Sequence, residues 1–389
     1  MTTVSLILTS LKYAKALGNQ MRTRNLRIPI GKPDIGREEI AAVEETMRTG
    51  WVTQGKKVEE FENAFAKYCG VKHGVAVNSG TAALHVALAS IGTKRGDEVM
   101  TTPLSCIATA NPIRYLNAKP VFVDVDPKTL NINPSLTQRK ITKKTKAIVP
   151  VHLFGHPADM APIMEIAEAS GLYVIEDAAQ ANGAKYKERK VGSIGHIACF
   201  SFYADKHITT VEGGIAVTND SELAEKMRML RNLGTDKHRK FYHPLLGFNY
   251  KMSDIHASIG IVQLKKLDKY ITKRRENAAY LNEKLDDLGL KLPSEEHYAF
   301  NVYYAYHILV EKGKKRVVES LEKEGVETRP LVSFIPAQPP YQRCGYNVNE
   351  HPVAKESHKK GFYVSNSPLL TKNELDYMAL ALRKAVSGR

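Results

Sequence analysis

The sequence has few cysteines and no long hydrophobic run. The four cysteines lie far apart and form no CxxC pair: Cys69, Cys106, Cys199 and Cys344. This spacing argues against a zinc knuckle and a disulfide framework, and we expect no metal site. The longest apolar stretches, such as 4–11 and 147–154, fall well short of the ~20 residues of a membrane span. We therefore expect a protein of the reducing cytoplasm that has no membrane partner and no signal peptide.

Acidic residues are fewer than basic ones. The 389 residues contain 56 Lys+Arg and 41 Asp+Glu, which gives a formal net charge of +15. Such an excess predicts an anionic partner: a nucleic acid, a membrane surface or a phosphorylated small molecule. Residues 1–27 hold five basic residues and no acid. We interpret this stretch as a basic N-terminal extension to which no function can be assigned.

From Ile28 onward the chain has no repeats and no low-complexity linker, and short apolar runs alternate with helical patterns. The predicted strands are Val75–Val77, Glu98–Thr102, Pro120–Val125, Ala147–His152 and Leu172–Glu176, and the predicted helices are Thr81–Ile91, Ile107–Leu116 and Asp159–Ala169. This alternation predicts an α/β fold with a mostly parallel sheet and helices on both faces, because parallel neighbours need a crossover connection.

After Lys206 the pattern changes. A helix is expected from Ser253 to about Leu288, followed by shorter elements at 304–311, 317–325 and 372–386. We divide the chain into a large α/β domain, residues 28–253, and a smaller C-terminal α+β domain, residues 254–389.

Ligands of an open parallel sheet bind at the carboxyl ends of its strands, so the polar residues there are the candidate site residues. The first candidates are in the segment Asn78–Ala82. Gly80 lets a ligand approach the backbone, and Thr81 adds a hydroxyl to the free N–H groups of a first helical turn, which together suit an anion. The alternative is a simple helix cap made by Ser79 or Thr81.

The second candidate is Asp177, which we expect just past the end of the strand Leu172–Glu176. A carboxylate in this position can keep a heterocycle nitrogen protonated, which makes a pyridine ring an electron sink. The alternative is an aspartate that caps the following turn.

The third candidate is Lys206, between an aromatic strand that contains Ser201 and the turn Glu212-Gly213-Gly214. A half-buried amine there would be a competent nucleophile, and Ser201 could supply another phosphate ligand. The alternative for Lys206 is an ordinary surface lysine.

The fourth candidate is the loop that runs from the basic residues Lys237–Lys240 to the segment Leu246–Met252. Its mixture of basic and aromatic residues is typical of an anion-binding or interface loop. The alternative is a solvated run of charge.

In this order and spacing, the four segments resemble the DegT/DnrJ family of pyridoxal-phosphate-dependent nucleotide-sugar aminotransferases, which have the fold of type I transferases. The resemblance extends from Ile28 to the C-terminus. It rests on five motifs: Asn78–Leu84, Glu176–Gln180, Ser201-Phe202 with Lys206, Glu212-Gly213-Gly214, and Gly247–Met252.

The resemblance implies a role for each candidate residue. Lys206 corresponds to the lysine that forms the internal aldimine with pyridoxal 5'-phosphate and moves protons, and Asp177 to the partner of the pyridine nitrogen. Gln180 corresponds to the residue beside the ring hydroxyl. The phosphate ligands would be Gly80, Thr81 and Ser201, and Asn249 would contact the phosphate held by the neighbouring subunit. A homodimer with two shared sites follows from this last role.

Two details qualify the resemblance. Where the family usually has an aromatic side chain that stacks on the cofactor ring, within the segment Pro103–Thr109, this chain has Cys106. Neither His207 nor Tyr203 can be given this role from the sequence. A related branch has histidine in place of the lysine and catalyses 3-dehydration, but here the register puts Lys206 at that position, which favours amination.

The implied reaction moves the amino group of L-glutamate to a nucleotide-linked ketosugar. The segments 202–203, 208–210 and 242–250 are most similar to those of GDP-perosamine synthases, which aminate a GDP-linked 4-keto-6-deoxy sugar. A UDP- or dTDP-linked 4-keto or 3-keto sugar is the alternative substrate. A regulatory, nucleic-acid-binding protein is the alternative of another class, although no nucleic-acid-binding motif is present and we expect no nucleic acid partner.

Overall fold

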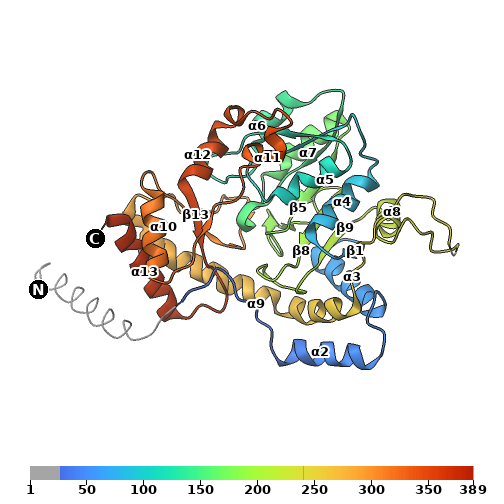
Figure 1. The fold of residues 1–389 in the computed structure, drawn as a ribbon, viewed down its shortest axis with the longest axis horizontal. Helices are drawn as coiled ribbons and strands as arrows, with labels where there is room; N and C mark the ends of the chain where they lie inside the picture. The colour runs from blue at the N-terminus through green and yellow to red at the C-terminus, as the bar shows by residue number, and fades with distance from the viewer. Residues whose placement is uncertain (1–26, 240, 389) are drawn as a thin grey trace, which may run out of the picture.

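The computed structural model describes residues 27–239 and 241–388. Nearly all of the predicted N-terminal extension, residues 1–26, therefore lies outside the described part of the chain. Figure 1 shows a central sheet between layers of helices, with a long helix that leads toward the C-terminal elements.

The central sheet has seven strands in the order β1-β9-β8-β5-β4-β2-β3. These strands are β1 His73–Val77, β2 Glu98–Thr101, β3 Lys119–Phe122, β4 Thr145–Val149, β5 Tyr173–Asp177, β8 Ile197–Ser201 and β9 Gly214–Thr218. From β8 to β3 all neighbours are parallel, whereas β9 runs antiparallel to both β8 and β1. The prediction of a mostly parallel α/β sheet is confirmed, and the predicted strands end within about three residues of the observed ones.

Both faces of the sheet are covered by helices. Val77 and Cys199 face a hydrophobic cluster that includes α4 (Gly80–Ser90) and α8 (Ser221–Arg231). On the opposite face lies a second cluster, which includes α3 (Lys56–Cys69) and α9 (Asp254–Leu285). The strand residues that face this cluster are Ala76, Ala198 and Phe200. Successive side chains of a strand point to opposite faces, so a strand buried on both faces is a nearly continuous hydrophobic run.

Several further elements surround the sheet. They are α2 Arg37–Arg48, α5 Asn111–Tyr115, α6 Pro134–Thr137, α7 Met160–Ser170, the 3₁₀ turns η1 Ile107–Thr109, η2 Gln138–Lys140 and η3 Leu153–Gly155, and a small sheet of β6 Lys185–Tyr186, β7 Arg189–Lys190 and β10 Ala299–Phe300. The helix expected over Ile107–Leu116 is thus divided into η1 and α5, because Pro112 in the first turn of α5 cannot continue a preceding helix.

The longest helix, α9 (Asp254–Leu285), joins two hydrophobic cores. The Ser253 hydroxyl caps it by accepting from the N–H of His256. Its first part packs Leu267 and Ile271 against the central sheet, and its last part packs Leu281 and Leu285 into the C-terminal cluster. The predicted helix over Ser253–Leu288 is confirmed as α9 with the 3₁₀ turn η4 (Asp286–Leu288). Because α9 belongs to both cores, the division of the chain at residue 253 stays a prediction.

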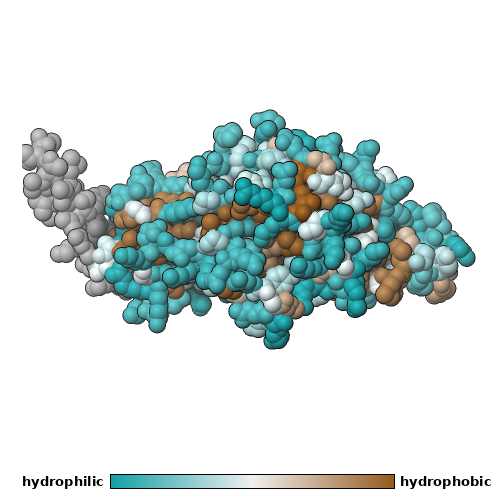
Figure 2. Space-filling model, turned by 90° about the horizontal axis from the view of Figure 1, so that it is seen from above, coloured by the Kyte–Doolittle hydropathy of each residue, from teal (hydrophilic) through white to brown (hydrophobic). Residues whose placement is uncertain are grey.

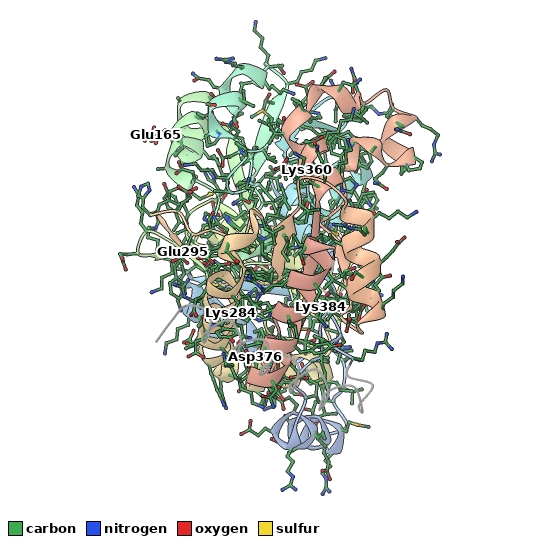
Figure 3. All side chains as sticks on the ribbon, turned by 90° about the vertical axis from the view of Figure 1, so that its left-hand side faces the viewer. Glu165, Lys284, Glu295, Lys360, Asp376 and Lys384 are labelled. Carbon is green, nitrogen blue, oxygen red and sulfur yellow. The ribbon has the colours of Figure 1, made fainter. Side chains whose placement is uncertain are left out.

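The C-terminal part is built on a three-stranded antiparallel sheet, β11-β13-β12. Its elements are β11 Tyr306–Leu309, α10 Lys314–Lys323, β12 Arg329–Pro330, η5 Ile335–Ala337, α11 Pro339–Gln342, η6 Val348–Glu350, α12 Pro352–Lys360, β13 Gly361–Val364 and α13 Lys372–Ser387. Figure 3 shows Lys284, Asp376 and Lys384 on α9 and α13, where these helices carry charge at the surface. Ile28, far away in sequence, is fully buried in the cluster beneath them. No helix of the described residues is long and apolar enough to cross a membrane.

Candidate functional site

Asp177 is the last residue of β5, at the carboxyl end of the strand. The sequence placed it just past the strand, which is wrong by one residue because its main chain still pairs with β8 and with Pro150 and His152. One carboxylate oxygen, Oδ2, accepts from the hydroxyl of Thr109 (2.7 Å), and Oδ1 accepts from the N–H of Ala179 (3.2 Å). The second bond is the predicted turn cap, so Asp177 caps the turn and also presents a carboxylate at the sheet edge.

The Asp177 carboxyl is buried without a cation beside it. Only 5% of the residue is exposed, and among the described residues no Lys, Arg or His lies within ion-pair distance of it. Burial raises the pKa of Asp177, and the bonds from Thr109 and Ala179 oppose this shift only in part. A carboxylate that is buried without an ion-pair partner is stabilised by a positively charged ligand.

Lys206 follows β8, the strand next to β5. Its Nζ lies 4.3 Å from the centre of the Tyr304 ring and 3.8 Å from Oδ1 of Asp205. Its side chain is 13% exposed, so the surface-lysine alternative is wrong. The register pairs Asp177 with Cys199 of β8, which brings the ends of these two strands together. Burial raises the pKa of Asp177, and the positive charge of Lys206 is one of the causes that lower it.

Gly80, Thr81 and Ser201 meet at the N-terminus of α4. A Cβ at Gly80 would lie 2.8 Å from the Cβ of Ser201, so only glycine allows this approach. The Ser79 hydroxyl accepts from the N–H of Ala82 (3.1 Å), and the predicted cap by Ser79 is therefore confirmed. The cap leaves the first N–H groups of α4 without a carbonyl partner, and with the hydroxyls of Thr81 and Ser201 they suit an anion.

Gln180 is fixed on the turn after Asp177. Its Oε1 accepts from the N–H of Phe154 (2.8 Å), a residue in the left-handed region with φ 54°. This bond orients the side-chain amide, and no bond within the described residues uses its Nε2. The amide nitrogen is thus available as a donor to a ligand beside Asp177.

Cys106 lies exposed just before η1, on the same turn that brings Thr109 to Asp177. Of the two residues that the sequence could not assign, His207 is buried beside Tyr304, with 5.8 Å between the ring centres, and its Nε2 faces the carbonyl oxygen of Val302. Tyr203 is 49% exposed. The effect of a cysteine at the usual ring-stacking position stays a prediction.

The side chain of Asn249 makes no hydrogen bond to the other candidate residues, although the N–H of Asn78 donates to the carbonyl oxygen of the next residue, Tyr250 (2.9 Å). Asn249 is exposed, and its backbone pairs with that of Asn232 beyond α8. In the same loop, Lys237 is exposed and paired with Glu225 (3.0 Å), as the charge-run alternative predicts.

The C-terminal part contributes residues that the sequence did not reveal. A small cavity beside Lys206 is lined by Arg274 of α9, by Tyr304 and by Tyr363 of β13. Burial is the main cause that lowers the pKa of Arg274, to about 10, and its Nη1 donates to the carbonyl oxygens of Tyr304 and Asn366, both at 2.8 Å. No local motif marks these residues, because they reach Lys206 only through the packing of α9.

Glu176, next to Asp177, holds the loop that leads into β8. Its carboxylate is fully buried and accepts from His152 Nε2 (3.0 Å) and from the N–H groups of Gly192, Ile194 and Gly195. Burial alone would raise the pKa of Glu176, but the bonds from His152 and the glycine N–H groups outweigh it and lower the pKa below 4.5. Glu176 therefore stabilises the fold above pH 4.5, and this contribution is lost as the pH falls through the lowered pKa.

We predict that Glu176→Gln lowers the free energy of unfolding at pH 7 by about 3 kcal/mol, the lower end of the cost of breaking a buried pair. The difference from the wild type should shrink below pH 4.5, which urea unfolding at several pH values would measure. Glu165→Gln is the control, because Glu165 is an exposed glutamate of α7 (Figure 3) without an ion pair, and it should change the stability by less than about 0.5 kcal/mol. Equal unfolding of Glu176→Gln and wild type at pH 7 would contradict this account.

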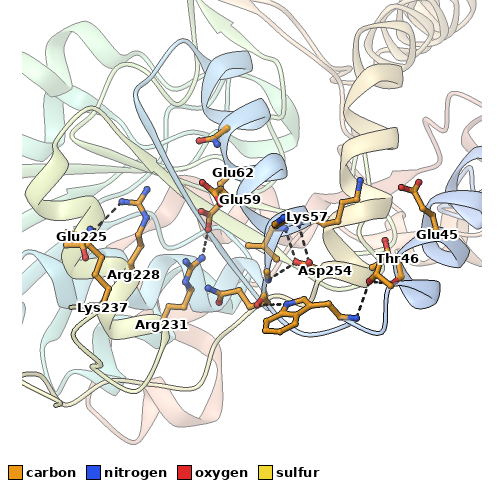
Figure 4. A pocket seen from close by; sticks show the side chains of 17 residues that line it. Glu45, Thr46, Lys57, Glu59, Glu62, Glu225, Arg228, Arg231, Lys237 and Asp254 are labelled. Carbon is orange, nitrogen blue, oxygen red and sulfur yellow. Dashed lines mark hydrogen bonds and ion pairs between the residues drawn. The ribbon is translucent and has the colours of Figure 1, made fainter. Parts of the chain in front are cut away.

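A larger cavity, of about 910 Å³, lies apart from these residues, between the start of α3 and the end of α8. Figure 4 shows acidic side chains such as Glu59 and Glu62 and basic ones such as Arg228 and Arg231 among the residues that line it. Of the candidate residues, Lys237 of the basic loop lines it.

Comparison with known proteins agrees with this geometry. A profile of the DegT/DnrJ/EryC1/StrS aminotransferase family matches residues 33–383. The chain belongs to this family. It is 40% identical over 364 residues to GDP-perosamine synthase of Caulobacter vibrioides, with 92% of this chain and 97% of the relative covered.

Solved structures of the family have the same fold. The chain is similar to DesV of S. venezuelae in complex with a ketimine intermediate (TM-score 0.87, 32% identity, 90% of this chain and 94% of the other covered). It is also similar to the PLP form of a putative sugar aminotransferase of Streptococcus pneumoniae (TM-score 0.90, 25% identity, 93% and 99% covered). The predictions of the family, of its fold and of an aminotransferase are confirmed.

Proposed function

We propose that the protein is a pyridoxal-phosphate-dependent aminotransferase that moves the amino group of L-glutamate to a GDP-linked 4-keto-6-deoxy sugar. The observation that carries the proposal is the buried Asp177 carboxylate without a cation, on the strand beside the one that leads to Lys206. A relative 40% identical over nearly its whole length is named GDP-perosamine synthase, which supports the choice of sugar. Another relative, 38% identical over 386 residues, is named a spore coat polysaccharide biosynthesis protein, which supports a role in polysaccharide biosynthesis.

The residues fit this cofactor. Pyridoxal phosphate supplies an electron sink and a temporary carrier for the amino group. The buried Asp177 would keep the ring nitrogen protonated, and the amide of Gln180 would donate to the ring hydroxyl. The N-terminus of α4, with Thr81 and Ser201, would hold the phosphate. Lys206 would anchor the cofactor covalently and, once released, carry the proton between the substrate carbon and the carbon of the cofactor.

We further propose a homodimer in which Asn249 completes the phosphate site of the neighbouring subunit. Asn249 is exposed, and no side-chain hydrogen bond to the described residues of its own chain holds it. The same loop exposes Phe241 (93%) and Leu246 (94%). Figure 2 shows hydrophobic side chains at the end of the molecule that carries this loop. Exposed apolar side chains of this size are typical of a protein interface.

The other parts of the proposal rest on chemistry. L-glutamate is the donor that the family resemblance implies. The basic loop would bind the diphosphate of a sugar nucleotide through Arg239, and through Lys237 once Lys237 leaves Glu225. The four free cysteines suit the cytoplasm, which we propose as the compartment.

The proposal is tested by offering L-glutamate with a panel of sugar nucleotides and examining the products by mass and proton spectra. We expect an amino sugar from the GDP-linked 4-keto-6-deoxy sugar, and 2-oxoglutarate in equal amount. An amino sugar formed only from UDP- or dTDP-linked 4-keto or 3-keto sugars would overturn the choice of nucleotide. Salt-sensitive duplex binding, without a visible absorption band that borohydride bleaches, would overturn the enzyme and favour the regulatory alternative.

A further inference from the structure

Residues 247–251 form a short strip that is held on both sides by main-chain bonds. On one side lies the chain just after α8, and on the other lies the end of β1. The bonds are Phe248 N to Leu230 O (2.6 Å), Leu233 N to Phe248 O (2.7 Å), Tyr250 N to Arg231 O (2.9 Å) and Asn78 N to Tyr250 O (2.9 Å). Isolated β-bridges thus join the strip to the end of β1 and to the chain after α8, and they fix the main chain on both sides of the exposed Asn249.

The side chain of Arg231 ties this strip to the core of the molecule. Its Nη1 donates to the carbonyl oxygen of Ala76 (2.6 Å) and to Oε1 of Glu62, and the same oxygen of Glu62 accepts from the N–H of Ala76 (2.8 Å). Figure 4 shows this pair at the wall of the large cavity. Glu62 comes from α3, Ala76 from β1 and Arg231 from the end of α8, so three elements meet at one buried ion pair.

Arg231 thus has two attachments. Its side chain is anchored to β1 and α3, whereas its main-chain oxygen holds Tyr250, the residue after Asn249. We propose that the Glu62–Arg231 pair is a positioning device that sets where Asn249 meets the cofactor phosphate of the neighbouring subunit. This inference rests on the proposed shared site. Glu62 and Arg231 are positioning residues, because they act only through Asn249.

The burial of the pair favours positioning over simple stabilisation. The side chains of Glu62 and Arg231 are 9% and 5% exposed, and Nε of Arg231 is buried without a partner among the residues that the structure describes. A buried ion pair is often no more stabilising than apolar residues of similar volume, since desolvation offsets the attraction of the charges. A matched apolar pair at these positions should therefore fold, but it would lose the directional bonds that fix the strip.

Mixed dimers provide the test. One subunit carries Glu62→Met and Arg231→Met and keeps Lys206. The other subunit carries Lys206→Ala and keeps the Glu62–Arg231 pair. A different affinity tag on each subunit allows the mixed dimer to be isolated. The readout is the pyridoxal phosphate fixed on Lys206 by borohydride and counted by mass spectrometry at several cofactor concentrations. The only lysine-bearing site of the mixed dimer receives its Asn249 from the subunit with the intact pair.

We expect the homodimer of the double variant to bind the cofactor roughly tenfold more weakly, as the loss of a bond to a charged phosphate would cause. In the mixed dimer the affinity should return to the wild-type value. A purely structural defect would stay with the lysine-bearing subunit and would not be rescued. Wild-type affinity in the double-variant homodimer, or weak binding that persists in the mixed dimer, would overturn the proposal.

Two further variants separate the possible failures. Asn249→Ala paired with Lys206→Ala tests the shared site alone: if this mixture is not rescued, the proposed dimer contact is wrong. If cofactor affinity is rescued in the Asn249→Ala mixed dimer but not in the mixed dimer with Glu62→Met and Arg231→Met, only the positioning role is wrong. Should the double variant fail to fold, Glu62→Gln keeps an acceptor for the N–H of Ala76, and it should show weaker cofactor binding with the same rescue.

Arg275→Met is the matched control. Like Arg231, Arg275 donates to a glutamate, Glu295, and to a main-chain oxygen, that of Asn301 (2.6 Å). Figure 3 labels Glu295, and the bonds of Arg275 go to Glu295 and Asn301, not to the strip. The control should bind the cofactor with wild-type affinity as a homodimer. An equal loss in this control would mean that any broken arginine bridge weakens binding, which would also overturn the positioning role.

Discussion

Replacement of Lys206 by alanine is expected to abolish repeated amino transfer. Proton transfer by a positioned side chain contributes roughly 10²- to 10⁴-fold to a rate, and the variant also loses the covalent anchor. Lys32 lines the same small cavity, but among the described residues Lys206 is the lysine whose ammonium lies over the Tyr304 ring. The measurement is the amount of amino sugar formed per subunit from the GDP-linked ketosugar and L-glutamate, determined by mass spectrometry.

The same variant should keep its fold. The nearest opposite charge to Nζ is Oδ1 of Asp205 at 3.8 Å, a partly exposed pair whose loss costs no more than about 1 kcal/mol. Circular dichroism and urea unfolding should therefore match the wild type within that margin. More than one amino sugar formed per subunit of a folded Lys206→Ala protein would refute the role of this lysine.

Replacement of Asp177 by asparagine is the second large expected effect. Asparagine has the same shape, and its oxygen can still accept from the N–H of Ala179, while the hydroxyl of Thr109 can turn to accept from the new amide. The variant should fold but should no longer hold a protonated ring nitrogen. The loss of one partner of a buried ion pair is worth about 3–5 kcal/mol, so we expect a rate roughly 10²- to 10⁴-fold lower.

Thr109→Val is the matched control for this prediction. It removes the bond from the Thr109 hydroxyl to Oδ2 of Asp177 and leaves the negative charge in place. Because a bond to a charged group is worth about 1.5–3 kcal/mol, the control should lose less activity than Asp177→Asn. Single-turnover rates of both variants would show whether the charge or the bond matters. Equal rates would mean that Asp177 serves only to hold the turn.

The sequence predicted those site residues that follow strands directly. Asp177 and Lys206 were found because β5 and β8 are short buried runs with polar residues at their carboxyl ends, and parallel neighbours bring these ends together. The Gly80 turn was predicted for the same reason. The predicted end of β5 is one residue too early, because hydrophobicity marks only the buried part of a strand. The main chain of Asp177 still forms strand-like hydrogen bonds with Pro150 and His152.

Other features of the site could not be read from the sequence. Arg274 and Tyr304 lie far from Lys206 along the chain and reach it only because α9 packs on the sheet and then continues into the second core. The bridge of Arg231 with Glu62 is equally non-local, since 169 positions separate the two residues. The net charge of +15 was the weakest guide, because it is spread over the surface and says little about a site of a few residues.

The buried position of Ile28 has a consequence for how the protein can be shortened. Ile28 forms two main-chain bonds with the segment around Val326, and the N–H of Ile30 donates to Glu327 (3.2 Å). One residue further, Gly31 passes so close to Asp205 that a Cβ there would lie 3.2 Å from the Cβ of Asp205. The family match begins only at residue 33. A polypeptide that began at residue 33 would lack Ile28, which would leave a cavity in the C-terminal core. It would also lack Gly31, which would uncover the turn that carries Lys206. The cooperative folding unit of this protein is therefore longer than the segment that matches the family profile.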